Sequence, residues 1–295
     1  MNECASCGRA FDERDGLLDL MTRQTQATVT FRMGQEVNVA TYTAGLNAVL
    51  REPPVSRCRV LPYHLDPAHA RVLETLPAGA TVLEIGCGGG QARPWLQERG
   101  IRYVGVDVSK ERVFDWLKDF GGPDLLCDAH RLPFKPAAFD AVYCAAVFEH
   151  LACPAVAAQE IRRVLKPGGV FLGNCAFLEP WHDSSYFHAS PAGVFALLSQ
   201  TGFATEYIWP GRGYSGFRAI MVMSGWLMNK FRWIGSAIYG MYRLENVTNA
   251  YVRKTLGRPP RFSDIEKRAR VAGAVDWIAR VPQFTGTATK DEQHS

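Results

Sequence analysis

The sequence predicts an α/β fold in which helices cover both faces of a doubly wound, seven-stranded, mostly parallel sheet. From Thr81 onward, short apolar runs alternate with helical stretches, and the first of these runs leads into the glycine-rich turn 86–90. Such alternation is typical of parallel strands joined by helical crossovers. The chain has 295 residues, of which 47% are hydrophobic and 21% charged. It is long and apolar enough for a large packed domain, which excludes wholesale disorder.

The first segment, residues 1–22, carries the motif Cys4-x-x-Cys7 followed by glycine. This motif is typical of one knuckle of a zinc ribbon, although a ribbon normally has two such pairs and the second is missing here. The alternative is a pair of reduced thiols. Three further residues are candidates to complete a zinc site, although no spacing rule selects them: Cys58, His64 and His69.

The predicted elements follow in order. Residues 23–64 form a helical or irregular lead-in that ends near a Pro-Pro break, and residues 65–213 form the α/β core. Within the core we expect helices at 68–76, 91–98, 112–119, 155–165 and around 194–198, and strands at 81–85, 103–106, 124–127, 139–144, 170–176 and 203–209.

The alternation of strands and helices stops at residues 214–265. This segment is rich in Met and aromatic side chains and predicts a helical insertion before the last strand. An insertion of this length is usually functional. It either packs on the core as a lid, lines an apolar acceptor pocket, or lies on a membrane surface with its basic side chains toward lipid head groups. Residues 266–284 supply the last core strand, and we expect the polar tail 285–295 to be mobile.

The formal net charge of +4 is small for this length. It gives no support to a DNA partner and little to RNA, because nucleic-acid binding usually requires a strongly basic face. The most apolar stretch, Phe217 to Tyr242, is interrupted by Lys230 and Arg232, so we expect no membrane span. With no signal-peptide pattern at the N-terminus, we expect a reducing, cytoplasmic location, with or without peripheral membrane contact.

The most informative motif is Glu84-x-Gly86-x-Gly88-x-Gly90 at the end of the first core strand. Glycines there permit a sharp turn and let a ligand approach bare backbone next to a helix N-terminus. The dinucleotide fingerprint would need a third glycine at position 91, which is Gln. The motif therefore disfavours a nicotinamide or flavin cofactor.

Two carboxylates follow in the expected places. Asp107 ends the second core strand, where a doubly wound sheet can bind the hydroxyls of a ribose. Asp128 ends the third. Each residue also has an ordinary structural explanation as a turn, a helix cap or a solvated strand end, but the ordered set points to a nucleoside site.

The glycine motif and the two carboxylates, together with Phe139-Asp140-Ala141-Val142 and Leu165-Lys166-Pro167-Gly168-Gly169, resemble the class I S-adenosylmethionine-dependent methyltransferases over residues 65–210. The resemblance is greatest to the small-molecule branch that includes the ubiquinone and menaquinone methyltransferases. It implies that Glu84 and the glycine backbone hold the methionyl end, Asp107 the ribose and Asp128 the adenine amine. The whole cofactor-contacting set that it implies is Glu84, Gly86, Cys87, Gly88, Gly90, Asp107, Val108, Asp128, Ala129 and Val147.

Three histidines are candidates for chemistry at the acceptor side. His150 follows the fourth core strand, and its alternative role is to position the cofactor or pack the loop. His182 and His188 belong to an aromatic loop after the fifth strand, and His188 has the alternative role of capping the next helix. Histidine is the natural base at neutral pH if the acceptor must lose a proton.

The resemblance implies methyl transfer to a hydroxyl or carbon of an apolar small molecule or lipid precursor. The sequence Cys144-Ala145-Ala146-Val147 lacks the Asn/Asp-Pro-Pro-aromatic motif of enzymes that methylate exocyclic or amide nitrogens, which disfavours that reaction. Two alternatives stay open: a ribosomal or transfer RNA methyltransferase, suggested by the Cys pair, and a non-catalytic S-adenosylmethionine-binding protein.

Overall fold

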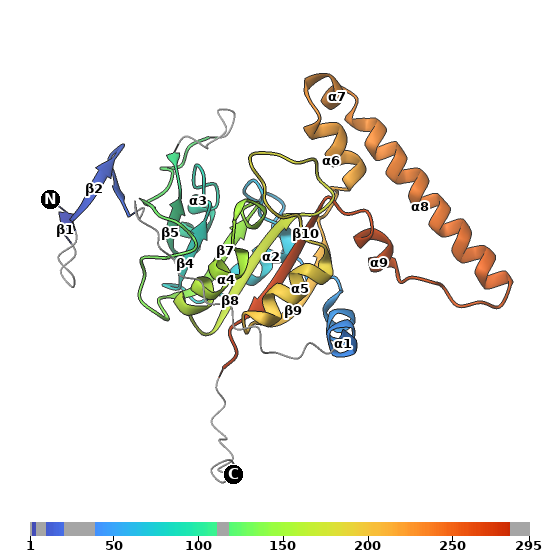
Figure 1. Ribbon diagram of the computed structural model, residues 1–295, viewed down its shortest axis with the longest axis horizontal. Coiled ribbons are helices and arrows are strands. Elements are labelled where there is room, and N and C mark those ends of the chain that lie inside the picture. Colours follow the sequence, from blue (N-terminus) through green and yellow to red (C-terminus); the bar gives the residue numbers. More distant parts are fainter. Residues whose placement is uncertain (1, 4–9, 21–38, 111–117, 284–295) are drawn as a thin grey trace, which may run out of the picture.

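A computed structural model describes residues 2–3, 10–20, 39–110 and 118–283. Within these residues, ten strands form one sheet (Figure 1). In sheet order they are β1 (Asn2–Glu3), β2 (Ala10–Arg14), β3 (Leu17–Asp19), β6 (Leu125–Leu126), β5 (Arg102–Asp107), β4 (Thr81–Ile85), β7 (Phe139–Ala145), β8 (Leu165–Ala176), β10 (Ala274–Arg280) and β9 (Ala204–Pro210).

The central strands β6, β5, β4, β7 and β8 are all parallel. Their sequences are nearly continuous apolar runs because helices cover both faces of the sheet. The last strand, β10, lies antiparallel between β8 and β9. The predicted mostly parallel sheet is therefore confirmed, and of its seven core strands β6, β5, β4, β7, β8, β10 and β9 only β10 runs in the opposite direction.

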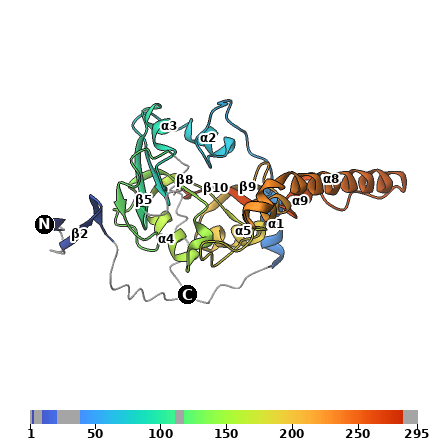
Figure 2. The same cartoon turned by 90° about the horizontal axis from the view of Figure 1, so that it is seen from above.

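Helices cover both faces of the sheet (Figure 2). On one face lie α2 (Pro67–Leu73) and α3 (Arg93–Gln97), and on the other α1 (Val39–Val49), α4 (Pro154–Val164) and α5 (Pro191–Gln200). Successive residues of a strand pack on opposite faces of the sheet. Val82 packs with α2 and α3, whereas Leu83 packs with α4 and α5. This is the period of two expected of a strand buried on both sides.

The sheet extends further than the sequence predicts. Residues 10–19 form a hairpin whose strand β3 pairs with β6 through Asp19 and Leu126. The interpretation of residues 1–22 as part of a zinc ribbon does not anticipate this pairing. Cys4 and Cys7 lie outside the described residues, as do most of the helix expected at 112–119 and the tail from 285, so those expectations remain predictions.

The insertion before β10 is helical, as the sequence predicts. It consists of α6 (Gly216–Met223), α7 (Trp226–Lys230), α8 (Arg232–Thr255) and α9 (Asp264–Ala269). Helix α8 projects away from the sheet, and both views show it standing clear of the core (Figures 1 and 2). Within the described residues, no helix is both long and apolar enough to cross a bilayer.

Candidate functional site

The site lies at the carboxyl ends of the central strands, where the strand order reverses. From β4 the chain continues outward to β5 and β6, and then returns to place β7 on the other side of β4. Loops that diverge at such a switch point leave a crevice in which open α/β sheets bind ligands. The glycine turn follows β4, and the turn 146–150 follows β7.

The glycine turn needs glycine for two different reasons. Gly86, Gly88 and Gly90 all have positive φ, at 67°, 51° and 71°, a region that side chains disfavour. A Cβ atom at Gly86 would overlap Cγ2 of Val147, so the turns after β4 and β7 are in direct contact. A Cβ at Gly88 would meet nothing within 4 Å, so the space beside this backbone is open to a ligand.

Asp107 connects the glycine turn to the end of β5. The backbone N–H of Gly88 donates to its Oδ2 at 2.9 Å, and that of Val108 to its Oδ1 at 2.7 Å. The Asp107 side chain is buried within this arrangement. The backbone N–H of Ser109 also donates to Oδ1, at 3.4 Å. A carboxylate oxygen can accept two hydrogen bonds, so Oδ2 keeps capacity for a ligand hydroxyl. This fixed carboxylate suits the ribose role that the resemblance implies.

Glu84 lies beneath the turn and is also buried. The hydroxyl of Tyr103 donates to its Oε2 at 2.5 Å. Burial raises the pKa of Glu84 to about 7, although the Tyr103 hydrogen bond and the charge of Arg93 act in the opposite direction. Cys87 is buried beside it, and burial raises the pKa of this thiol far above its usual range, so the sulfur stays protonated.

Asp128 is held by its neighbour His130. The backbone N–H and Nδ1 of His130 both reach Oδ1 of Asp128, at 2.9 and 2.6 Å, and these hydrogen bonds lower the pKa of the carboxyl. The other ring nitrogen, Nε2, accepts from the backbone N–H of Cys153 at 3.2 Å. Asp128 is thereby ionised and oriented at the end of β6, next to the buried Ala129.

The turn after β7 is constrained from both sides. Ala146 has a φ of 54° and its N–H donates to Oδ1 of Asn174 on β8 at 2.7 Å. The short 3₁₀ helix Phe148–His150 follows, with Phe148 packed against Phe171 and Trp277 in the core. This packing fixes the direction in which Glu149 and His150 leave the turn.

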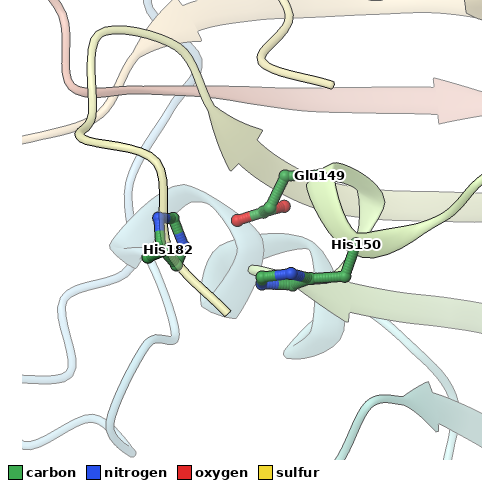
Figure 3. Close-up of side chains that lie close together, drawn as sticks. All are labelled: Glu149, His150 and His182. Carbon is green, nitrogen blue, oxygen red and sulfur yellow. The ribbon is translucent and has the colours of Figure 1, made fainter. Parts of the chain in front are cut away.

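The three candidate histidines lie close together. The ring centroids of His150 and His182 are 5.3 Å apart, and those of His182 and His188 are 5.9 Å apart. Figure 3 shows the side chains of Glu149, His150 and His182 converging. Residues that are more than 30 positions apart in the sequence therefore form one cluster at the carboxyl edge of β7 and β8.

Two carboxylates in this cluster were not singled out in the sequence. Burial raises the pKa of Glu149 to about 7. It also raises the pKa of Glu179 to about 7, with a further contribution from the charge of Glu149. For His188, burial lowers the pKa, so this imidazole is neutral at pH 7. Glu149 stood next to His150 in the sequence, but nothing in the pattern distinguished a buried glutamate from a solvated one.

A protein-family model described as "Methyltransferase domain" matches residues 83–173, which run from the glycine turn to the middle of β8. This span includes the glycine turn, Asp107, Asp128 and the turn after β7. The chain carries a class I S-adenosylmethionine-dependent methyltransferase domain.

Several named methyltransferases are similar to part of this chain. The chain is 34% identical over 131 residues to the 2-methyl-6-phytyl-1,4-hydroquinone methyltransferase of Synechocystis sp., covering 41% of each chain. It is 33% identical over 97 residues to the ubiquinone biosynthesis O-methyltransferase of Idiomarina loihiensis, covering 31% of this chain and 40% of the relative. It is also 34% identical over 109 residues to a tRNA (carboxymethyluridine(34)-5-O)-methyltransferase of Arabidopsis thaliana, covering 36% and 26%.

These matches span less than half the length of each relative. Among solved structures, the chain is similar to phosphoethanolamine N-methyltransferase 2 of Haemonchus contortus in complex with S-adenosyl-L-methionine, with 20% identity and a TM-score of 0.45. That similarity covers 72% of this chain and 51% of the other. The methyltransferase of Mesorhizobium loti gives 16% identity and a TM-score of 0.43, covering 72% and 96%.

Two of the residues considered as completing a zinc site, Cys58 and His69, have hydrogen-bond partners within the protein. Cys58 donates its thiol to the carbonyl of Val60 at 3.2 Å. His69 is completely buried in α2, with Nε2 3.1 Å from the carbonyl oxygen of Trp277. A zinc ion bound by Cys4 and Cys7 stays a prediction that the described residues do not test.

Proposed function

We propose that this protein transfers the methyl group of S-adenosylmethionine to a hydroxyl or carbon of an apolar small molecule or lipid precursor. The observation that carries the proposal is the cradle formed by the Gly86–Gly88 backbone and the Asp107 carboxylate. It offers open space beside Gly88 and a fixed acceptor for ribose hydroxyls. The quinone methyltransferases among the similar proteins support the acceptor class.

When bound, S-adenosylmethionine supplies an activated methyl group with a good leaving group, so the protein's task is alignment and exclusion of water. In the proposed arrangement, Val147 lies against Gly86 and closes one side of the cradle. His150, His182 and His188 face the acceptor from the neighbouring loops. His188 is neutral, and its Nε2 lies 3.1 Å from Oγ of Ser185. A neutral imidazole can take a proton from an acceptor hydroxyl, so we assign His188 this role.

The insertion and the segment that joins it to β10 contact the loop after β8, which carries His182. The N–H groups of Phe177 and Leu178 donate to the carbonyl of Gly273 at 2.6 and 3.0 Å. Gly216, at the start of α6, lies so close to Leu178 that a Cβ there would overlap its side chain. Movement of the insertion would therefore be transmitted to the loop that carries His182.

Helix α8 has the features of a helix that lies on a lipid surface. Trp233, Leu244 and Tyr251 are 63%, 66% and 68% exposed, and their spacing of 11 and 7 residues places them on one line along the helix. The exposed cations Arg232, Arg243 and Lys254, again 11 residues apart, form a second line on one flank. An apolar stripe beside a row of positive charge complements an anionic membrane surface. We propose that α8 makes peripheral contact with lipid, from which an apolar acceptor is drawn.

The reaction is tested by supplying the protein with S-adenosylmethionine carrying an isotopically labelled methyl group in a cell extract. We expect label in the lipid-soluble small-molecule fraction, identified by mass spectrometry. Label in no fraction, with the cofactor bound, identifies a non-catalytic binding protein and overturns the proposal.

A second candidate function is methylation of transfer RNA. It is favoured by the similarity to tRNA (carboxymethyluridine(34)-5-O)-methyltransferases, at 34% and 36% identity over about one third of this chain. In the same extract experiment, this function places the label in the RNA fraction. It also predicts an RNA affinity that falls steeply with salt.

A further inference from the structure

The cluster at the acceptor side is built from two separate loops that are attached to each other. Glu149 and His150 leave the turn after β7, and His182 belongs to the loop after β8. The N–H groups of Tyr186 and Phe187 donate to the backbone carbonyl of Glu149 at 2.6 and 3.2 Å. The backbone on both sides of the cluster is therefore fixed, and one potential ligand atom from each of the three side chains lies within 4.8 Å of the others.

Glu149 contributes a buried carboxylate to this cluster. It is only 2% exposed, and within the described part of the chain its Oε2 atom has no hydrogen-bond partner. A buried carboxylate oxygen without a partner is costly, because the lost hydration is not replaced. Figure 3 shows the carboxylate directed toward the space between the two imidazole rings. A cation in that space would supply the missing interaction.

His182 is oriented so that one nitrogen can serve as a ligand. Its Nδ1 lies 2.9 Å from the carbonyl oxygen of Pro180. A carbonyl only accepts, so Nδ1 carries the proton, and in this tautomer Nε2 is the nitrogen available to a metal ion. Histidines that bind metals commonly donate their other N–H to a backbone carbonyl in this way, which fixes both the tautomer and the ring direction.

We propose that Glu149, His150 and His182 bind one divalent transition-metal ion of the Zn²⁺ type. Two imidazoles and one carboxylate match the ligands that such ions select, whereas Mg²⁺ and Ca²⁺ prefer oxygen alone. Ligand atoms on one tetrahedral ion lie about 3.3 Å apart, so modest side-chain rotations close the site.

Three protein ligands leave a position on the ion for water or for another oxygen. The site is on the same turn as Val147, which contacts Gly86 of the cofactor cradle. The ion would therefore bind the acceptor through a hydroxyl oxygen and lower its pKa. This choice of an oxygen acceptor over a carbon acceptor rests on the proposed function, whereas the ion site itself does not.

The experiment measures metal binding to the full chain without any S-adenosylmethionine. The parent protein carries Cys4→Ser and Cys7→Ser, which removes the candidate zinc knuckle. We expect it to bind one Zn²⁺ per chain by calorimetry, and to give a Co²⁺ visible spectrum without the near-ultraviolet absorption of a cobalt–thiolate bond. Glu149→Gln and His182→Gln should each weaken Zn²⁺ binding at least tenfold. The matched control is His188→Gln, in the same loop, which should keep the parent affinity.

Equal Zn²⁺ affinity in the parent, Glu149→Gln and His182→Gln proteins overturns the site, and so does an equal loss in His188→Gln. Circular dichroism and S-adenosylhomocysteine binding report whether each variant is folded. If a variant does not fold, the Co²⁺ spectrum of the parent protein tests the proposal instead. A parent that does not bind one Co²⁺ per chain through nitrogen and oxygen ligands contradicts the proposed site. Methyl transfer is measured separately, so failure of the ion site and failure of the proposed function give different results.

Discussion

Gly88 donates its backbone N–H to Oδ2 of Asp107 at 2.9 Å, and this hydrogen bond joins the glycine turn after β4 to the end of β5. The donor and acceptor lie 19 positions apart in the sequence, one in the turn after β4 and the other at the end of the adjacent parallel strand β5. Because the bond holds both parts of the cradle before any ligand arrives, little rearrangement is needed for binding.

Gly86→Ala should unfold the protein more easily and prevent cofactor binding. The substitution places a side chain at positive φ, which costs about 1–2 kcal/mol, and overlaps Val147, which costs about 1–3 kcal/mol more. Urea denaturation measures the sum. Gly257→Ala is the matched control, because Gly257 has a φ of 65° and open space around it.

The same overlap predicts partial rescue. Gly86→Ala combined with Val147→Ala should recover the part of the free energy of unfolding that comes from the clash, while the part due to φ remains. A double variant no more stable than Gly86→Ala alone would show that the turns after β4 and β7 are not in contact.

Cofactor affinity should increase as the pH rises toward 7. Burial raises the pKa of Glu84 to about 7, so below that pH the carboxyl is largely protonated. In the proposed pose the ionised carboxylate accepts a hydrogen bond from the ammonium group of the cofactor, so binding releases the proton of the Glu84 carboxyl. Affinity for S-adenosylhomocysteine should then rise up to about tenfold per pH unit below pH 7, measured by calorimetry from pH 5.5 to 7.5.

Glu84→Gln is the control for this pH dependence. The amide cannot ionise, so the variant should bind more weakly at pH 7.5 and show a flat profile. If the affinity of the wild type is equally independent of pH, Glu84 does not contact the methionyl end of the cofactor.

Polar substitutions on the stripe of α8 should weaken binding to anionic lipid. Trp233→Ser together with Leu244→Ser removes two exposed apolar side chains from one line of the helix, and burial of each is worth about 1.5–3 kcal/mol. Vesicle co-sedimentation with phosphatidylserine should show at least a tenfold loss of binding. The variant Asn249→Ser, on the same helix but outside the stripe, should bind like the wild type.

Much of the fold follows from local sequence. The runs 81–85, 139–145 and 274–280 are apolar and are bounded by turn residues, and each forms the expected strand. The glycine spacing also disfavours a dinucleotide site without any knowledge of tertiary structure. The hairpin at 10–19 was not anticipated, because its pairing with β6 joins segments more than 100 residues apart and involves a single pair of residues.

The acceptor side was less accessible to sequence reasoning. His150, His182 and His188 were each candidates, but their proximity depends on the hydrogen bonds between Glu149 and the loop after β8. Glu149 was missed because its burial is a property of tertiary packing. The partner of Asp128 was missed for a different reason, since an Asp followed two positions later by His is common in solvated turns.

Calorimetric titration with S-adenosylhomocysteine tests the cradle most directly, using the wild type, Asp107→Asn and, as the control, the exposed Asp264→Asn of α9. One site per chain with micromolar affinity is expected for the wild type and for Asp264→Asn. Asp107→Asn should bind at least tenfold more weakly, because ribose hydroxyls lose a charged acceptor. Absence of binding to the wild type, or equal binding by all three proteins, would contradict the cradle formed by Gly88 and Asp107.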